Sequence, residues 1–207
     1  MGKHAHSTDS RLLSRIRRME PGSVFMPKQF HDLGTRNAVA SALKRMKAAG
    51  LVRQLSRGVY DLPIIKPAIG EVPPSSAAIA RAMELSENAK VQPSGASAAN
   101  MLGISEQVPA RTIFLTSGPS RVIRIGKRQI TFKHAAPRNM AGAGTKAGLI
   151  VSAMRHMGRG NIDASTLEAI LRNIAPGERP AVARDISHAP AWIADTIRPV
   201  LEEASSR

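Results

Sequence analysis

Residues 35–62 read TRNAVASALKRMKAAGLVRQLSRGVYDL, and this stretch decides the fold of the first third of the chain. Thr35 is a favoured helix N-cap, and apolar residues spaced three and four apart follow it as far as Met46. Gly50 suits the left-handed position just after a helix. Two short apolar runs then flank a turn at Arg57-Gly58. The stretch therefore predicts an amphipathic helix followed by a two-stranded hairpin.

The residues before this stretch complete a known order of elements. Ser7, Thr8 or Asp9 can cap a helix that runs to about Met19. A short strand over 23–26 and a short helix over 28–32 are predicted after it. Helix, strand, short helix, helix and hairpin is the order of a winged helix-turn-helix. In that fold one helix lies in the DNA major groove, and the hairpin, called the wing, reaches the neighbouring backbone. The alternative is the same fold used for protein contacts alone.

The charge of the chain favours a polyanionic partner. Its 207 residues include 30 Lys and Arg but 15 Asp and Glu, a net charge of +15. Residues 1–66 hold 13 basic and 4 acidic residues, so the predicted winged-helix segment carries a net charge of +9. Basic side chains gain affinity by displacing counterions from phosphates, and we therefore expect duplex DNA as the partner. Aromatic residues make up 3% of the chain, which disfavours stacking on single strands.

The predicted DNA-contacting residues lie on the helix and the wing. Arg36 and Asn37 are suited to read guanine and adenine, because each can form two hydrogen bonds with its base. Other basic residues are expected to contact phosphates. The predicted set is Thr35, Arg36, Asn37, Ser41, Lys44, Arg45, Lys47, Arg53 and Arg57.

A second region follows a proline-rich linker. Four prolines fall within residues 63–76, so we expect a winged-helix domain over 1–66 and a second domain over 67–207. In the second domain, two helices are predicted before residue 103. Alternating runs over 111–134 then predict a small antiparallel sheet, and several helices follow from residue 146. The predicted class is α+β.

Several other kinds of site find little support. The chain has no cysteine, which excludes disulfides and zinc fingers, and the sequence shows no clustered metal ligands or catalytic motif. Residues 142–147, GAGTKA, loosely match a dinucleotide fingerprint with Asp163 beyond it, but no buried strand precedes them and a connector is favoured. No cofactor or enzymatic activity is expected. There is also no apolar run of membrane-spanning length, so we expect a cytoplasmic protein.

Residues 93–121, PSGASAANMLGISEQVPARTIFLTSGPSR, and 123–138, IRIGKRQITFKHAAPR, resemble the central region of the AbiEi-type antitoxins of type IV toxin–antitoxin systems. Residues 42–63, ALKRMKAAGLVRQLSRGVYDLP, are similar to the winged-helix part of the same family. The resemblance covers about residues 8–140 and is weaker after 145.

The resemblance implies a bacterial protein with two roles. The N-terminal domain would bind inverted repeats in its own promoter and repress the operon. The antitoxin-type domain would counter a nucleotidyltransferase-like toxin without necessarily forming a stable complex with it. Three alternatives remain: an RNA-binding or enzymatic antidote acting through residues 75–207, a stand-alone winged-helix regulator, and a structural adaptor. For the first, the basic residues are Arg121, Arg124, Lys127, Arg128 and Lys133.

Overall fold

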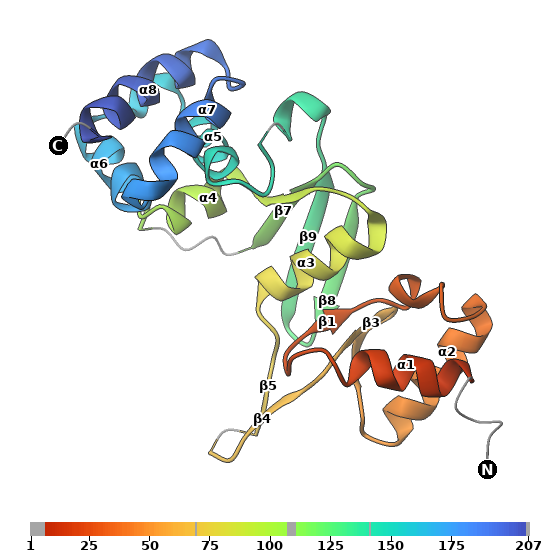
Figure 1. Ribbon diagram of the computed structural model, residues 1–207. Coiled ribbons are helices and arrows are strands. Elements are labelled where there is room, and N and C mark those ends of the chain that lie inside the picture. The colour runs from red at the N-terminus through yellow and green to blue at the C-terminus, as the bar shows by residue number, and fades with distance from the viewer. Residues whose placement is uncertain (1–6, 69, 107–110, 141, 206–207) are drawn as a thin grey trace. The chain divides into compact units, whose positions relative to one another are not determined.

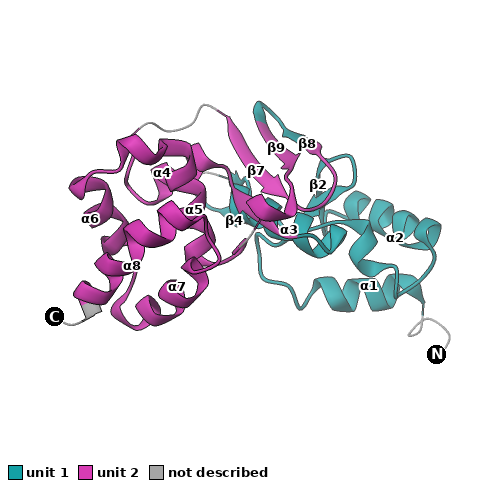
Figure 2. Ribbon diagram, turned by 90° about the horizontal axis from the view of Figure 1, so that it is seen from above, with its two compact units in different colours: residues 1–89, 123–128 teal, residues 90–122, 129–207 magenta. Residues whose placement is uncertain are grey.

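The computed structural model describes residues 7–68, 70–106, 111–140 and 142–205, and they form a mixed α+β protein. The chain divides into two compact units, coloured separately in Figure 2. The first unit comprises residues 1–89 and 123–128, and the second comprises residues 90–122 and 129–207. The predicted domains 1–66 and 67–207 remain a prediction, whereas these compact units divide the chain after Ala89.

The first unit begins with two helices and a small sheet (Figure 1). Its elements are α1 (Thr8–Ile16), β1 (Val24–Phe25), the 3-10 helix η1 (Pro27–Phe30), α2 (Arg36–Ala48), β2 (Arg53–Ser56), β3 (Val59–Asp61), β4 (Ile64–Lys66), β5 (Gly70–Val72) and α3 (Ser76–Glu87). The order of elements through β3 is the one predicted from the sequence. Strands β1, β3 and β2 lie in that order in an antiparallel sheet, with β3 in the centre.

Helix α2 forms where the sequence predicts it, for local reasons that can be named. The Thr35 hydroxyl accepts a hydrogen bond from the Ala38 amide at 3.2 Å, and Gly50 has a φ of +69° just after the helix. Its apolar side packs on α1 and η1 in a core that includes Leu12, Phe30 and Leu43, all fully buried. Burial of this face fixes which residues of α2 point outward.

The predicted linker is not an extended connector. Residues 64–66 and 70–72 form the antiparallel hairpin β4–β5, with Ile64 opposite Val72. The prolines lie outside the paired residues, where they remove no ladder hydrogen bond, and this is why a proline-rich stretch can still form a hairpin. Helix α3 follows, capped by Ser75, and packs on β1 and η1 of the first unit.

The second unit combines a four-stranded sheet with a group of helices (Figure 1). Its elements are β6 (Val91–Pro93), α4 (Gly95–Met101), β7 (Thr112–Thr116), β8 (Arg121–Ile125), β9 (Arg128–His134), η2 (Pro137–Asn139), α5 (Lys146–Met157), η3 (Arg159–Asn161), α6 (Ala164–Arg172), η4 (Pro176–Glu178), α7 (Arg179–Ile186) and α8 (Ala191–Ser205). The tip of the β8–β9 hairpin, residues 123–128, is counted with the first unit.

The sheet order is β6-β7-β9-β8, and its strand directions differ from the expected antiparallel sheet. Strands β6 and β7 are antiparallel, but β7 and β9 run parallel, with Phe114 opposite Phe132. The chain reverses before β8 and again after it, and β9 then inserts next to β7. Alternation predicted β7, β8 and β9 correctly, because it reports which residues are buried and not which strand is the neighbour.

The helices of the second unit enclose an aliphatic core. Ile150, Met154, Ile186 and Ile193 are fully buried in it. Helices α4 and α5 lie close together, and α5 also contacts β6. Within the described residues, the chain contains no helix of the length and apolarity needed to cross a membrane.

Candidate nucleic-acid interface

The outward side of α2 presents polar and basic residues in one row. Val39, Ala42, Leu43 and Met46 face the core, and the opposite side is exposed. Asn37, Ser41 and Lys44 follow one another at four and three positions, so they lie on one helix face, and Arg36 borders it. All four side chains are exposed, and within the described residues no hydrogen bond or ion pair engages them.

Thr35, Arg45 and Lys47 already have partners within the first unit. The Thr35 hydroxyl caps α2, as described above. The Arg45 guanidinium donates two hydrogen bonds to Asp9 at 2.8 and 2.6 Å, and the Lys47 ammonium donates one to Gln54 at 2.8 Å. The hydrogen bonds from Arg45 lower the pKa of the Asp9 carboxyl. Since both side chains of the Arg45–Asp9 pair are exposed, the pair contributes little to stability, and a phosphate could displace Asp9.

Arg57 lies at the tip of the β2–β3 hairpin. Gly58 beside it has a φ of +72°, a backbone angle that glycine adopts without strain and that closes the turn. The register of the hairpin shifts between Gln54 and Ser56, which marks a bulge just before the tip. The Arg57 side chain is exposed and makes no ion pair within the described residues. Like the exposed residues of α2, Arg57 is therefore free to contact a phosphate.

Arg53 is engaged by two carboxylates of its own unit. Its guanidinium donates to both oxygens of Asp61 at 3.0 and 2.6 Å, to Glu71 at 2.6 Å and to the Val72 carbonyl at 3.1 Å. The Asp61 side chain is 1% exposed, and that of Arg53 is 22% exposed. The hydrogen bond to Asp61, and then that to Glu71, raise the pKa of Arg53 above its ordinary value. The sequence could not reveal this role, because Glu71 lies in a hairpin that was predicted as a linker.

The basic residues predicted to bind RNA in the alternative lie in different environments. Arg128 donates to the Pro74 carbonyl at 2.9 Å and to the Ser76 hydroxyl at 3.0 Å, so it anchors the start of α3 within the first unit. Arg124 and Lys127 are exposed at the hairpin, and Lys133 lines a pocket of the second unit.

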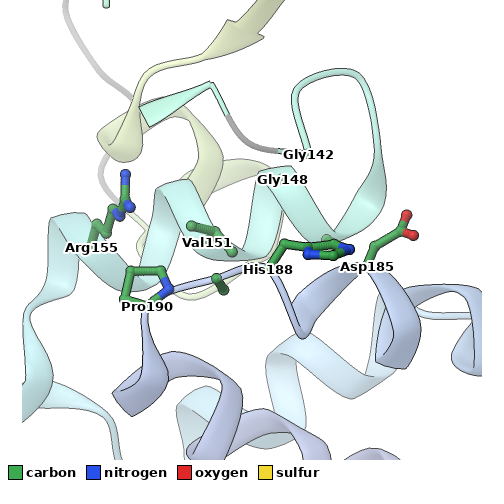
Figure 3. A pocket seen from close by; sticks show the side chains of 9 residues that line it. Gly142, Gly148, Val151, Arg155, Asp185, His188 and Pro190 are labelled. Carbon is green, nitrogen blue, oxygen red and sulfur yellow. The ribbon is translucent and has the colours of Figure 1, made fainter. Parts of the chain in front are cut away.

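A small pocket in the second unit is lined by acidic, basic and imidazole side chains (Figure 3). Asp185 and His188 line it from the α7 side, and Arg155 and Val151 line it from α5. Its volume is about 10 Å³, room for a single water molecule. Within the described residues, no group of three or more His, Asp or Glu side chains could hold a metal ion.

The glycine-rich stretch before α5 has a structural explanation. A Cβ on Gly148 would collide with the Gly142 carbonyl oxygen, so the backbone of the connector rests directly on the start of α5. Thr145 caps that helix through the Gly148 amide at 3.1 Å. Asp163 caps α6 by accepting from the Thr166 amide at 2.8 Å, and hydrogen bonds from Thr166 and Ser165 lower the pKa of Asp163 to about 2. These residues therefore build two helix starts.

Comparisons with known proteins give a family and weak structural matches. The model of a protein family described as "Family of unknown function (DUF6088)" matches residues 11–177. Among solved structures, the crystal structure of the RV2827C protein from Mycobacterium tuberculosis matches at 16% identity, covering 93% of this chain and 81% of that chain, with a TM-score of 0.38. No curated protein is similar enough to count as a match.

Proposed function

We propose, for a chain that belongs to the DUF6088 family of unknown function, that the first unit is a winged helix-turn-helix that binds duplex DNA. On this proposal the protein is a transcriptional repressor of its own operon. The observation that carries it is the outward face of α2, where Arg36, Asn37, Ser41 and Lys44 are exposed and unengaged within the described residues.

The topology of the first unit supports the winged-helix assignment. Helix α1, strand β1, helix η1, helix α2 and hairpin β2–β3 follow in the order typical of that fold. Strand β1 pairs with β3, so the hairpin is held to the body of the unit by a strand that precedes α2. Helix η1 is a single 3-10 turn, and residues 31–35 connect it to α2.

Each exposed residue has a proposed role. Arg36 and Asn37 lie in the first turn of α2, the end that enters the groove most deeply in related motifs, and they would contact base edges. Ser41 and Lys44 lie farther along the same face, and Lys44 would contact phosphate. Arg57 at the hairpin tip would contact the neighbouring backbone. Arg45 and Lys47 would join by exchanging Asp9 and Gln54 for phosphates, and Arg53 would hold the hairpin in position.

The antitoxin role rests on the resemblance to AbiEi-type proteins. We propose that the protein binds inverted repeats in its own promoter and represses transcription of its operon in the bacterial cytoplasm. Its second unit would counter a nucleotidyltransferase-like toxin. Co-expression with the reading frame next to its own gene tests this role. If that frame encodes no growth inhibitor, or if the protein does not relieve the inhibition, the antitoxin role is wrong, while the repressor role still stands.

A gel-shift titration of the full chain on the DNA upstream of its gene tests the repressor role. We expect specific binding that weakens steeply as salt rises. Arg36→Ala and Asn37→Ala should each weaken specific binding by about 1–3 kcal/mol and relax the sequence preference. Arg57→Ala should weaken binding to all sequences about equally and lower the salt slope by about one.

Lys66→Ala provides a matched control. Lys66 is an exposed cation of the same unit, but it lies in β4, outside α2 and the β2–β3 hairpin. Its loss should change specific binding little. If wild-type protein shows no sequence preference at moderate salt, or if Lys66→Ala weakens binding as much as Arg36→Ala, the proposed interface is wrong and the binding reflects net charge alone.

A further inference from the structure

The second unit contains an open pocket lined by two cations and two histidines. It has a volume of about 490 Å³ and lies among β6, β7, β9, the segment after β9, and α5. Four of its lining side chains are Lys133, His134, Arg155 and His156. Among the described residues that line it, none is Asp or Glu. A pocket with this composition attracts anions, since its cations are not neutralised by acids in its own wall.

Arg155 is the best-positioned cation of this pocket. It is half-buried, and its guanidinium donates to the Asn139 side-chain oxygen at 2.8 Å and to the Arg138 carbonyl at 3.3 Å. Both acceptors are uncharged, and within the described residues no carboxylate pairs with Arg155. The hydrogen bonds hold the guanidinium in place while its charge remains uncompensated. A fixed arginine of this kind suits a phosphate, whose oxygens match the planar donors of a guanidinium.

The pocket is also shaped for something larger than a simple ion. Its volume falls within the range of pockets that bind small organic molecules and cofactors. Leu115, Ala135, Ala136 and Val151 give it an apolar wall beside the cations. At its inner side, Gln92 is 4% exposed and donates to the Asn139 carbonyl at 2.8 Å. This donation fixes the orientation of the Gln92 amide. A ligand with a ring or a sugar at one end and an anionic group at the other would fit a pocket that has an apolar wall beside its cations.

Local packing holds the walls of the pocket in place. Gly95, at the start of α4, lies against α5 so closely that a Cβ there would collide with the Cβ of His156. Ser152 is held nearby by a hydrogen bond to the Pro93 carbonyl at 3.1 Å. His134 on the opposite side has its Nδ1 at 3.0 Å from the Gly118 carbonyl. These contacts fix the backbone around the cations, so a ligand would meet a largely preformed site.

We propose that this pocket binds a phosphorylated ligand of mononucleotide size, with its phosphate at Arg155 and Lys133 and its ring or sugar along the apolar wall. The site lies within the second unit, and the inference holds whether or not the first unit binds DNA. It gives the second unit a ligand-sensing role that the resemblance to antitoxins does not imply.

Calorimetric titration of the full chain tests the proposal, with AMP and GMP as probes and adenosine, guanosine and inorganic phosphate for comparison. We expect saturable binding of a nucleoside monophosphate, weaker binding of phosphate and no detectable binding of the nucleosides. Lys133→Ala and Arg155→Met should each weaken binding roughly tenfold or more, since each removes a charge-assisted contact. Lys133 is exposed, so its variant should fold normally.

Lys127→Ala is the matched control, because Lys127 is an exposed lysine that does not line the pocket. It should leave the affinity unchanged. Amide shifts of labelled protein on adding AMP or GMP should cluster at residues around the pocket, such as Leu115 and Ser152. The proposal is overturned if neither nucleotide binds, if a nucleoside binds as tightly as its monophosphate, or if Lys127→Ala weakens binding as much as Lys133→Ala. Binding of an RNA oligonucleotide without binding of mononucleotides would overturn it as well.

Discussion

The ion pair between Arg53 and Asp61 should be one of the most costly polar interactions to disrupt in the first unit. Asp61→Asn keeps the size of the side chain but removes its charge, and it turns one acceptor oxygen into an amide that faces the Arg53 donors. The Asp61 side chain is 1% exposed, so no water can replace the lost interaction. Removing one partner of a buried pair costs about 3–5 kcal/mol. Because Arg53 keeps Glu71 and is 22% exposed, we expect about 2–3 kcal/mol.

Asp9→Asn is the matched control for this prediction. Asp9 also accepts two hydrogen bonds from one arginine, at 2.8 and 2.6 Å, but its pair with Arg45 is exposed. The same substitution in the same kind of pair should therefore lower stability far less. The two variants differ mainly in burial, so the difference between them isolates the cost of leaving a charge in the interior.

Urea unfolding measures both variants with a reporter inside each unit. Tyr60 is the sole tyrosine of the chain and stacks on Phe25 at 6.1 Å in the first unit. Trp192 is the sole tryptophan and belongs to the second unit, so its emission follows that unit in the same samples. We expect Asp61→Asn to lower the midpoint reported by Tyr60 by roughly 1 M or more. If it lowers the midpoint no more than Asp9→Asn does, the pair does not hold the hairpin and this reasoning fails.

Three further outcomes follow from helix caps and close packing. The lowered pKa of Asp163 means that its stabilising effect is complete above the ordinary pKa of an aspartate and is lost as the pH falls from about 4 to about 2. Thermal melts of Asp163→Asn should therefore show a smaller loss of stability over this window than wild type, and an equal loss would contradict the assignment. Gly148→Ala should destabilise the second unit by about 1–3 kcal/mol or prevent its folding, because the added Cβ meets the Gly142 carbonyl, and Trp192 emission during unfolding would reveal it. Ser75→Ala removes the acceptor for the Ala78 amide at 3.1 Å and should cost about 1 kcal/mol in urea unfolding; an unchanged midpoint would contradict the role of Ser75 as the cap.

Local signals in the sequence were sufficient to locate most elements. Helix α2 was predicted from Thr35, Gly50 and a periodic apolar face, all of which act within a few residues. The strands over 112–134 and the helices after residue 146 were predicted for the same reason. Caps and alternation depend on neighbours in the chain, so the sequence shows them directly.

Features that depend on distant residues could not be predicted in this way. The parallel pairing of β7 with β9 depends on which strand is the neighbour, and the β4–β5 hairpin was masked by prolines that lie outside the pairing. Arg53 and Arg57 belong to the same predicted hairpin, and both were predicted to contact DNA. In the structure, however, Glu71 of another hairpin accepts a hydrogen bond from Arg53. The basic pocket was missed as well, since Lys133 and Arg155 come from separate elements and no motif joins them.

The position of β8 at the edge of its sheet suggests that the basic residues of this strand oppose aggregation. Strand β8 is the outermost of the four, so one of its edges has no partner strand within the sheet. Such an edge can pair with the same edge of another molecule and begin aggregation. The sequence RVIRI carries an exposed apolar residue, Val122, which would favour that pairing, and the exposed charge of Arg124 opposes it. The arginines of this strand would then keep the protein dispersed in a crowded cell.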